Sequence, residues 1–177
     1  NEITFDLMKW FKHLLCFLFF YGYSQQPSHL LIGEDELAGI NIYSSIQDID
    51  NSIVLATNSG LFRYDTLNFS SINSNLIGDQ SLFGLIKNSK GIIFCYNLSG
   101  QIFCIKNNQL QLFCTVPKEY LSSVIQLCFD KQDNLYISCK KLLNVNLDKK
   151  ISVLYTFKSE EASSLAIDKE GKIYFYD

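Results

Sequence analysis

Residues 47–65 read QDIDNSIVLATNSGLFRYD, and this stretch decides the fold. A polar turn begins at Asp48. Ile46 precedes this turn, and the strand-forming run 53–57 follows it. Asp and Asn side chains cap turns, and Asn or Gly supplies the positive φ that tight turns need. A second turn at Gly60 leads into another short run of strand formers, 61–64. The stretch therefore predicts consecutive antiparallel strands joined by tight turns.

The same pattern recurs three more times along the chain. The leading Asp or Asn residues stand at positions 48, 88, 130 and 168, so the copies are 40, 42 and 38 residues apart. Gly91 and Gly171 occupy the first turn of the second and fourth copies, and Gly100 repeats Gly60 forty residues later. A fourth short apolar run follows in three copies, at 69–72, 110–115 and 153–157. Each repeat thus contains four short strands.

Four-stranded units of about 40 residues are typical of propeller blades. The sequence predicts an all-β fold, a β-propeller with about three and a half four-stranded blades in residues 42–177. A closed ring needs roughly 4–8 blades, so we expect an incomplete ring. Two other all-β folds fit the sequence less well. A β-sandwich does not require a sequence repeat of forty residues, and the repeat of a β-solenoid is usually shorter.

Composition and charge narrow the function classes. The chain is 47% hydrophobic and 19% charged, which favours a folded core over disorder. Its net charge is −3 and it has no long basic run, so we expect no nucleic-acid partner.

The N-terminal region carries the pattern of an export signal. Residues 8–24 combine two lysines, an apolar run of ten residues and small residues before Gln25, which is typical of a secretory signal peptide. A membrane anchor would need about 20 apolar residues, and an ordinary buried element is the other alternative. We therefore expect an upstream overhang at 1–7, a signal peptide at 8–24, a lead-in segment at 25–41 and the partial propeller at 42–177.

Cysteines and carboxylates give no metal site or cofactor site. Five cysteines remain beyond Cys16 of the predicted signal, an odd number without a CxxC pair, so free buried thiols are favoured over disulfides or zinc. Asp48 and Asp50 allow an incomplete calcium loop, but turn capping is the favoured interpretation. We expect no cofactor and no metal.

The chain also lacks a recognisable catalytic motif. His29 is the one histidine beyond the predicted signal, and no nucleophile, zinc-protease, P-loop or dinucleotide motif accompanies it. We expect no catalytic residue in this segment. Whether the whole protein is an enzyme stays open.

Residues 47–65 resemble the two-component regulator propeller repeat. Asp48, Thr57, Gly60, Leu61, Tyr64 and Asp65 match that pattern. Val54 stands where the family has a Trp, and Asn51 stands where it has a turn Gly. The later copies keep fewer matching residues. The second keeps Gly91, Phe94 and Gly100. The third and fourth keep the leading Asp130 or Asp168 and the aromatic Tyr136 or Tyr174, with Gly171 in the turn of the fourth.

The resemblance implies a periplasmic sensor region of a sensor histidine kinase from bacteria related to Bacteroides and Flavobacterium. In that family more blades, a triple-tyrosine domain, a membrane helix and a kinase domain follow. It implies signal transduction across the inner membrane, an unidentified small-molecule or glycan ligand, contacts with further blades of the same chain, and a homodimer of the full receptor. The alternative is a secreted or periplasmic binding or scaffold module without a kinase. A third interpretation of the function is a propeller enzyme.

Overall fold

A computed structural model describes residues 32–72, 79–146, 148–158 and 164–176. The predicted overhang, the predicted signal peptide, His29 and part of the lead-in segment lie outside the described residues. The chain divides into two units, Asn1–Glu34 and Asp35–Asp177, and every described strand belongs to the second. In the described part of the chain, no helix combines the length and apolar character needed to cross a membrane.

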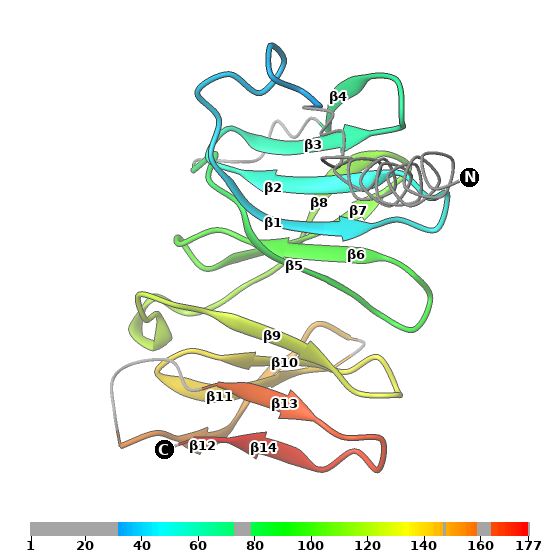
Figure 1. The fold of residues 1–177 in the computed structure, drawn as a ribbon. Helices are drawn as coiled ribbons and strands as arrows, with labels where there is room; N and C mark the ends of the chain where they lie inside the picture. Colours follow the sequence, from blue (N-terminus) through cyan, green and yellow to red (C-terminus); the bar gives the residue numbers. More distant parts are fainter. Residues whose placement is uncertain (1–31, 73–78, 147, 159–163, 177) are drawn as a thin grey trace, which may run out of the picture. The chain divides into compact units, whose positions relative to one another are not determined.

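The strands form separate antiparallel sheets in which each strand pairs with its neighbour in sequence (Figure 1). Blade 1 contains β1 (Ile42–Gln47), β2 (Ile53–Thr57), β3 (Gly60–Tyr64) and β4 (Phe69–Ile72). Blade 2 contains β5 (Phe83–Lys87), β6 (Ile93–Tyr96), β7 (Gln101–Lys106) and β8 (Gln109–Thr115). Blade 3 contains β9 (Gln126–Phe129), β10 (Leu135–Ser138), β11 (Lys141–Val145) and β12 (Ile151–Thr156). The hairpin of blade 4 consists of β13 (Leu165–Ile167) and β14 (Ile173–Phe175).

This architecture confirms the predicted all-β propeller of three four-stranded blades and part of a fourth. Some local features differ from the sequence expectation. A short 3₁₀ helix, Lys118–Tyr120, lies between blades 2 and 3. Strand β12 begins at Ile151, two residues before the apolar run that predicted it, because backbone pairing with Val145 rather than side-chain hydrophobicity sets its first residue.

The core lies between consecutive blades, and blade 2 contributes to both of its halves. Successive side chains of a strand point to opposite faces of the sheet. In β6, Ile93 and Cys95 join the cluster shared with blade 1, whereas Phe94 and Tyr96 join the cluster shared with blade 3. All four residues are buried, so both faces of this strand lie in a core. This explains why the central strands are nearly continuous apolar runs.

Aromatic contacts link each blade to the next one. The rings of Tyr43 and Phe83 stack at 4.4 Å between blades 1 and 2. Phe94 meets Phe129 at 4.8 Å between blades 2 and 3. Tyr155 contacts Phe175, 4.9 Å away, between blade 3 and the blade 4 hairpin. Aromatic pairs add roughly 0.5–1.5 kcal/mol beyond the area that they bury.

The described cysteines behave as small core residues. All five are free, and Cys95, Cys104 and Cys139 are buried. Burial raises the pKa of each of these three thiols, as it does that of Cys114, which reaches about 12. Neutral, buried thiols of this kind are poor nucleophiles.

Candidate functional site

The first turn of each blade lies at one end of the sheets, and we call this end the turn face (Figure 1). It consists of residues 48–52, 88–92, 130–134 and 168–172. The third residue after each leading Asp or Asn has positive φ, and these residues are Asn51 (67°), Gly91 (77°), Asp133 (63°) and Gly171 (84°). The turns of blades 2 and 3 touch, because Ser89 donates hydrogen bonds from its backbone N and its Oγ to the Asp133 carboxylate, at 2.8 and 2.9 Å.

The leading aspartates of blades 3 and 4 are directed into their own turns. Asp130 Oδ1 accepts the backbone N–H groups of Gln132 and Asn134, both at 2.9 Å. Its Oδ2 accepts the Asn134 amide at 2.9 Å and the Tyr136 hydroxyl at 3.3 Å.

Asp168 repeats this arrangement in the blade 4 hairpin. Its Oδ1 accepts the N–H groups of Glu170 and Lys172, and its Oδ2 accepts the Tyr174 hydroxyl at 2.9 Å. These bonds, led by the N–H of Lys172, hold the pKa of Asp168 below its ordinary value.

Blade 1 replaces the tyrosine with an arginine. Arg63 Nη2 pairs with Asp48 at 2.8 Å, and Nη1 pairs with Asp50 at 3.2 Å and donates to Ser52 Oγ. Its Nε donates to the Asn108 side chain in blade 2 at 3.1 Å, so Arg63 ties the two blades together.

This network shows which groups the carboxylates of Asp48 and Asp50 bind. Asp48 also accepts the N–H of Ile49, and Asp50 accepts both the N–H and the hydroxyl of Ser52. The Ser52 hydroxyl is the main reason that the pKa of Asp50 is lowered. The cation beside the carboxylates is the Arg63 guanidinium. In this structure both carboxylates cap their own turn and pair with Arg63.

Two clefts open on the turn face. The blade 1–2 cleft, about 440 Å³, lies between the turn of blade 1 and blade 2. Arg63, Asp50, Lys90 and Asn108 supply polar groups, and Ile93 is among its apolar lining residues.

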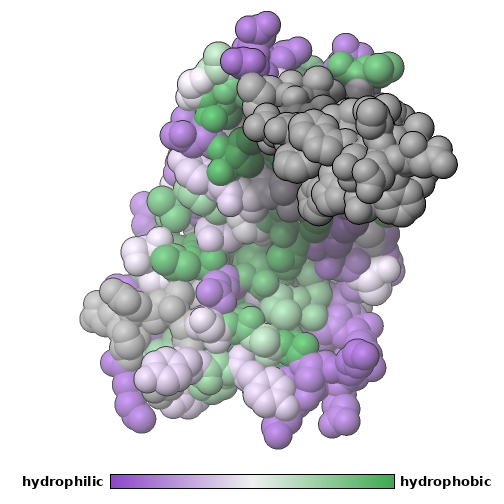
Figure 2. All heavy atoms as spheres, viewed as in Figure 1, coloured by the Kyte–Doolittle hydropathy of each residue, from purple (hydrophilic) through white to green (hydrophobic). Residues whose placement is uncertain are grey.

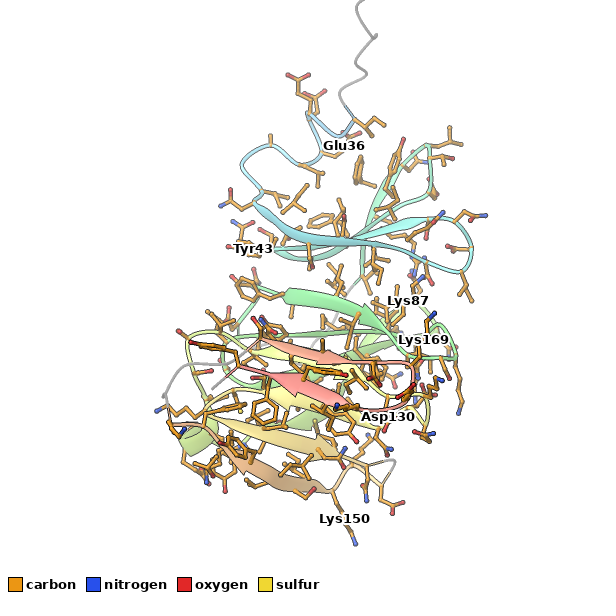
Figure 3. The ribbon with its side chains drawn as sticks, turned by 60° about the horizontal axis from the view of Figure 1, so that its bottom comes forward. Glu36, Tyr43, Lys87, Asp130, Lys150 and Lys169 are labelled. Carbon is orange, nitrogen blue, oxygen red and sulfur yellow. The ribbon has the colours of Figure 1, made fainter. Side chains whose placement is uncertain are left out.

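The inner-strand cleft, about 350 Å³, lies where β5, β9 and β13 end. Its charged lining comes from three blades and consists of Lys87, Asp130, Lys131, Asp168 and Lys169. Figure 3 shows Lys87 and Lys169 close together on the right-hand side, Asp130 below them, and Lys150 at the lower end of the view. In Figure 2, hydrophilic residues gather at the lower right, where Figure 1 shows the β9–β10 and β13–β14 turns.

The structure brings some of the predicted repeat residues into these clefts and leaves others as fold residues. Asp48 and Gly91 line the blade 1–2 cleft, and Asp130 and Asp168 line the inner-strand cleft. The remaining ones lie outside both clefts, and they are Thr57, Gly60, Leu61, Tyr64, Asp65, Gly100 and Gly171.

These remaining residues shape turns and core. Thr57 Oγ1 donates to the Gly60 carbonyl at 2.8 Å, and Tyr64 donates to the Thr66 carbonyl at 2.9 Å. Asp65 accepts the N–H groups of Leu67 and Asn68, and these bonds lower its pKa, the one from Asn68 most. Leu61 is buried.

Sequence reasoning missed the basic residues of the site. Arg63 lies inside the motif that identified the repeat. Its position between Phe62 and Tyr64 predicted a strand but gave no indication of its partners. Lys87, Lys131 and Lys169 each adjoin a leading Asp or Asn, and that adjacency was the available signal. A lysine beside a turn is ordinarily a solvated surface residue.

Comparison with known sequences gives no identification. No known protein-family model matches the chain, and no curated protein matches it.

Solved structures with the same fold do match. The extracellular domain of BT3049, named as a hybrid two-component system of Bacteroides thetaiotaomicron, matches 86% of the chain with a TM-score of 0.62 at 14% identity. That of BT4673, named likewise, matches 77% with a TM-score of 0.57 at 16% identity. Virginiamycin B lyase from Staphylococcus aureus matches 74% with a TM-score of 0.60 at 10% identity.

The chain spans only part of each of these proteins: 47% of the lyase, 23% of the BT3049 domain and 22% of the BT4673 domain. At these identities the likeness concerns the fold. The chain is a β-propeller, and its resemblance to the propellers of Bacteroides-type two-component sensors is matched at the level of the fold.

Proposed function

We propose that this chain is an exported, ligand-sensing propeller segment of a two-component sensor histidine kinase. The observation that carries the proposal is the fold similarity, over 86% of the chain, to an extracellular domain named as part of a hybrid two-component system. The repeat motif that ends in Gly60, Leu61, Tyr64 and Asp65 supports the same assignment independently, because it resembles the repeat of such receptors.

The turn face is the part of the segment that suits ligand recognition. Small-molecule sites are concave, have volumes of about 300–1,000 Å³, and combine apolar walls with a few placed polar groups. Both clefts fall in this range and mix isoleucine or phenylalanine with charged residues. In the proposed receptor the ligand is a small molecule or a glycan. Further blades of the same chain and a second receptor copy are its proposed protein partners.

Cell fractionation tests the location. An antibody against the propeller is expected to detect the full-length product in the inner-membrane fraction of the host bacterium. Protease added from the periplasmic side is expected to degrade the propeller. Recovery from the soluble periplasm or the medium would instead support the secreted binding module without a kinase, and recovery from the cytoplasm would refute export.

A thermal-shift panel tests the ligand-binding part of the proposal. The full chain is heated with neutral sugars, uronic acids, organic acids and sulfated sugars at graded concentrations. At least one class is expected to raise Tm saturably, because a ligand bound only by the folded state stabilises it by mass action. A panel without any saturable shift would count against a sensor role and favour a scaffold.

A further inference from the structure

The inner-strand cleft is lined by three lysines from three successive blades. Lys87 ends β5, and Lys131 and Lys169 follow the leading aspartates of blades 3 and 4. Lys87 is half-buried, and Lys131 and Lys169 are exposed. Among the described residues, none of the three forms an ion pair with a carboxylate, and the recorded partner of Lys87 is the backbone carbonyl of Gln47 in blade 1.

The two carboxylates that share the cleft do not neutralise these lysines by direct contact. Both oxygens of Asp130 and both oxygens of Asp168 accept hydrogen bonds from their own turns, at 2.8–3.3 Å. The Asp133 carboxylate nearby is bound by the backbone N and Oγ of Ser89. The acidic groups therefore serve the fold, and among the described residues the ammonium groups of Lys131 and Lys169 form no ion pair or hydrogen bond.

From this arrangement we infer that the inner-strand cleft binds an oxyanion-bearing small molecule, a carboxylate or a sulfate ester, through Lys131 and Lys169 with Lys87 beside them. Each ammonium group has three N–H donors and no acceptor, so it demands acceptor oxygens. Hydrogen bonds from an ammonium to an oxyanion are shorter and stronger than neutral ones.

The volume is large enough for a small ligand. About 350 Å³ holds one small acid or one acidic sugar ring. Phe129 and Ile167 offer apolar surface beside the charges, which suits a carbon ring or chain that carries the anionic group. The inference rests on the proposed function, because it names the ligand class of that sensor.

Isothermal titration of the full chain at low ionic strength tests the inference, with sodium citrate, sodium glucuronate and sodium sulfate as probes and D-glucose as the neutral control. Citrate or glucuronate is expected to bind saturably, and binding is expected to weaken as salt is added. Binding of glucuronate without sulfate would assign the carboxylate, and binding of sulfate without glucuronate would assign a sulfate group as the recognised oxyanion.

Three single-lysine variants test the cleft, two inside it and one outside it as the control. Lys131→Gln and Lys169→Gln are each expected to weaken anion binding about three- to tenfold, since each removes one charged hydrogen-bond donor. Lys150→Gln removes the same charge outside the cleft and is expected to change affinity by less than about twofold. No recorded contact within the described fold depends on the ammonium groups of Lys131, Lys169 or Lys150, and equal urea midpoints would show that all three variants fold.

The inference is overturned if no anion binds, or if Lys131→Gln and Lys169→Gln bind as wild type does. A neutral sugar that binds saturably while the anions do not would overturn it and leave the sensor proposal standing. Cytoplasmic location in the fractionation test would remove the sensor proposal itself, whatever the anion result.

Discussion

The first turn of each blade begins with an Asp or Asn, and the blades differ in the group that binds the second side-chain oxygen of the Asp. The leading Asp of a turn has one oxygen for the turn N–H groups and a second that needs another donor. The sixth residue after the leading one is Val54, Phe94, Tyr136 or Tyr174 in the four blades. Where it is tyrosine, its hydroxyl donates to the second oxygen. Where it is Val54, Arg63 takes over, and where it is Phe94, the leading residue is the neutral Asn88.

Arg63 is therefore expected to stabilise blade 1 and its contact with blade 2. Arg63→Met should lower the free energy of unfolding by about 1–3 kcal/mol, because it leaves Asp48 and Asp50 without a cation and removes the bond to Asn108. The Arg63 and Asp48 side chains are each 14% exposed, so screening by water is only partial. Urea denaturation followed by circular dichroism measures the change.

The matched control for Arg63→Met is Lys150→Met, which removes an exposed cation that forms no ion pair with another described residue. It should shift stability by less than about 0.5 kcal/mol. Equal effects of the two substitutions would show that the Arg63 network does not hold the blades together.

At the scale of elements, the first strands of the blades are joined by a hydrogen bond from the same repeat position. Ser44 in β1 accepts the backbone N–H of Leu85 in β5, and Gln126 in β9 accepts that of Leu165 in β13. Both acceptors stand four residues before their leading Asp. The corresponding residue of blade 2 is Gly84, which has φ +63° at a register shift in β5.

Gly84 should tolerate no side chain. A Cβ there would lie 2.3 Å from Cε1 of Tyr96, a ring that is buried and stacked against Phe83. Gly84→Ala is expected to destabilise the fold by about 2–4 kcal/mol through overpacking and the positive φ. Urea unfolding measures this loss.

Gly171→Ala separates the two causes. Gly171 also has positive φ, at +84°, but a Cβ there meets nothing within 4 Å. Its substitution should cost only about 1 kcal/mol. A Gly84→Ala variant as stable as Gly171→Ala would contradict the predicted clash.

The sequence was informative about elements whose pattern is local. The hairpin turns could be predicted because their Asp, Asn and Gly residues act within a few residues of themselves. The contacts of Arg63 with Asn108 and of Ser44 with Leu85 join residues more than 40 apart and leave no short-range pattern. The lysines of the inner-strand cleft could not be predicted for the same reason, because they come together only when three blades pack side by side.

At the scale of the molecule, stability resides between blades rather than within them. Each pair of consecutive complete blades shares one buried cluster, and blade 2 supplies alternate residues to both clusters. A repeat that cannot bury its apolar faces alone depends on its neighbours in this way. Carboxylates of the turns add a dependence on pH, because several of them cap backbone N–H groups.

Acid should weaken the folded state. Asp50, Asp65 and Asp168 have folded-state pKa values below the ordinary 3.8, so their bonds stabilise the fold above that pH. The contribution is lost as pH falls through the lowered pKa values, and we expect Tm to drop below about pH 4. Asp65→Asn, which caps without titrating, should flatten the drop. A Tm that rises on acidification would contradict this assignment.

Hydrogen–deuterium exchange tests the central claim, that the turn face of this propeller is its recognition face. The full chain is labelled with and without a saturating amount of the panel compound that raises Tm most. The account predicts slower exchange in residues 87–92, 129–134 and 167–172, with unchanged exchange in residues 57–60 and 97–101. Protection confined to those two segments, with the turn face unchanged, would contradict it.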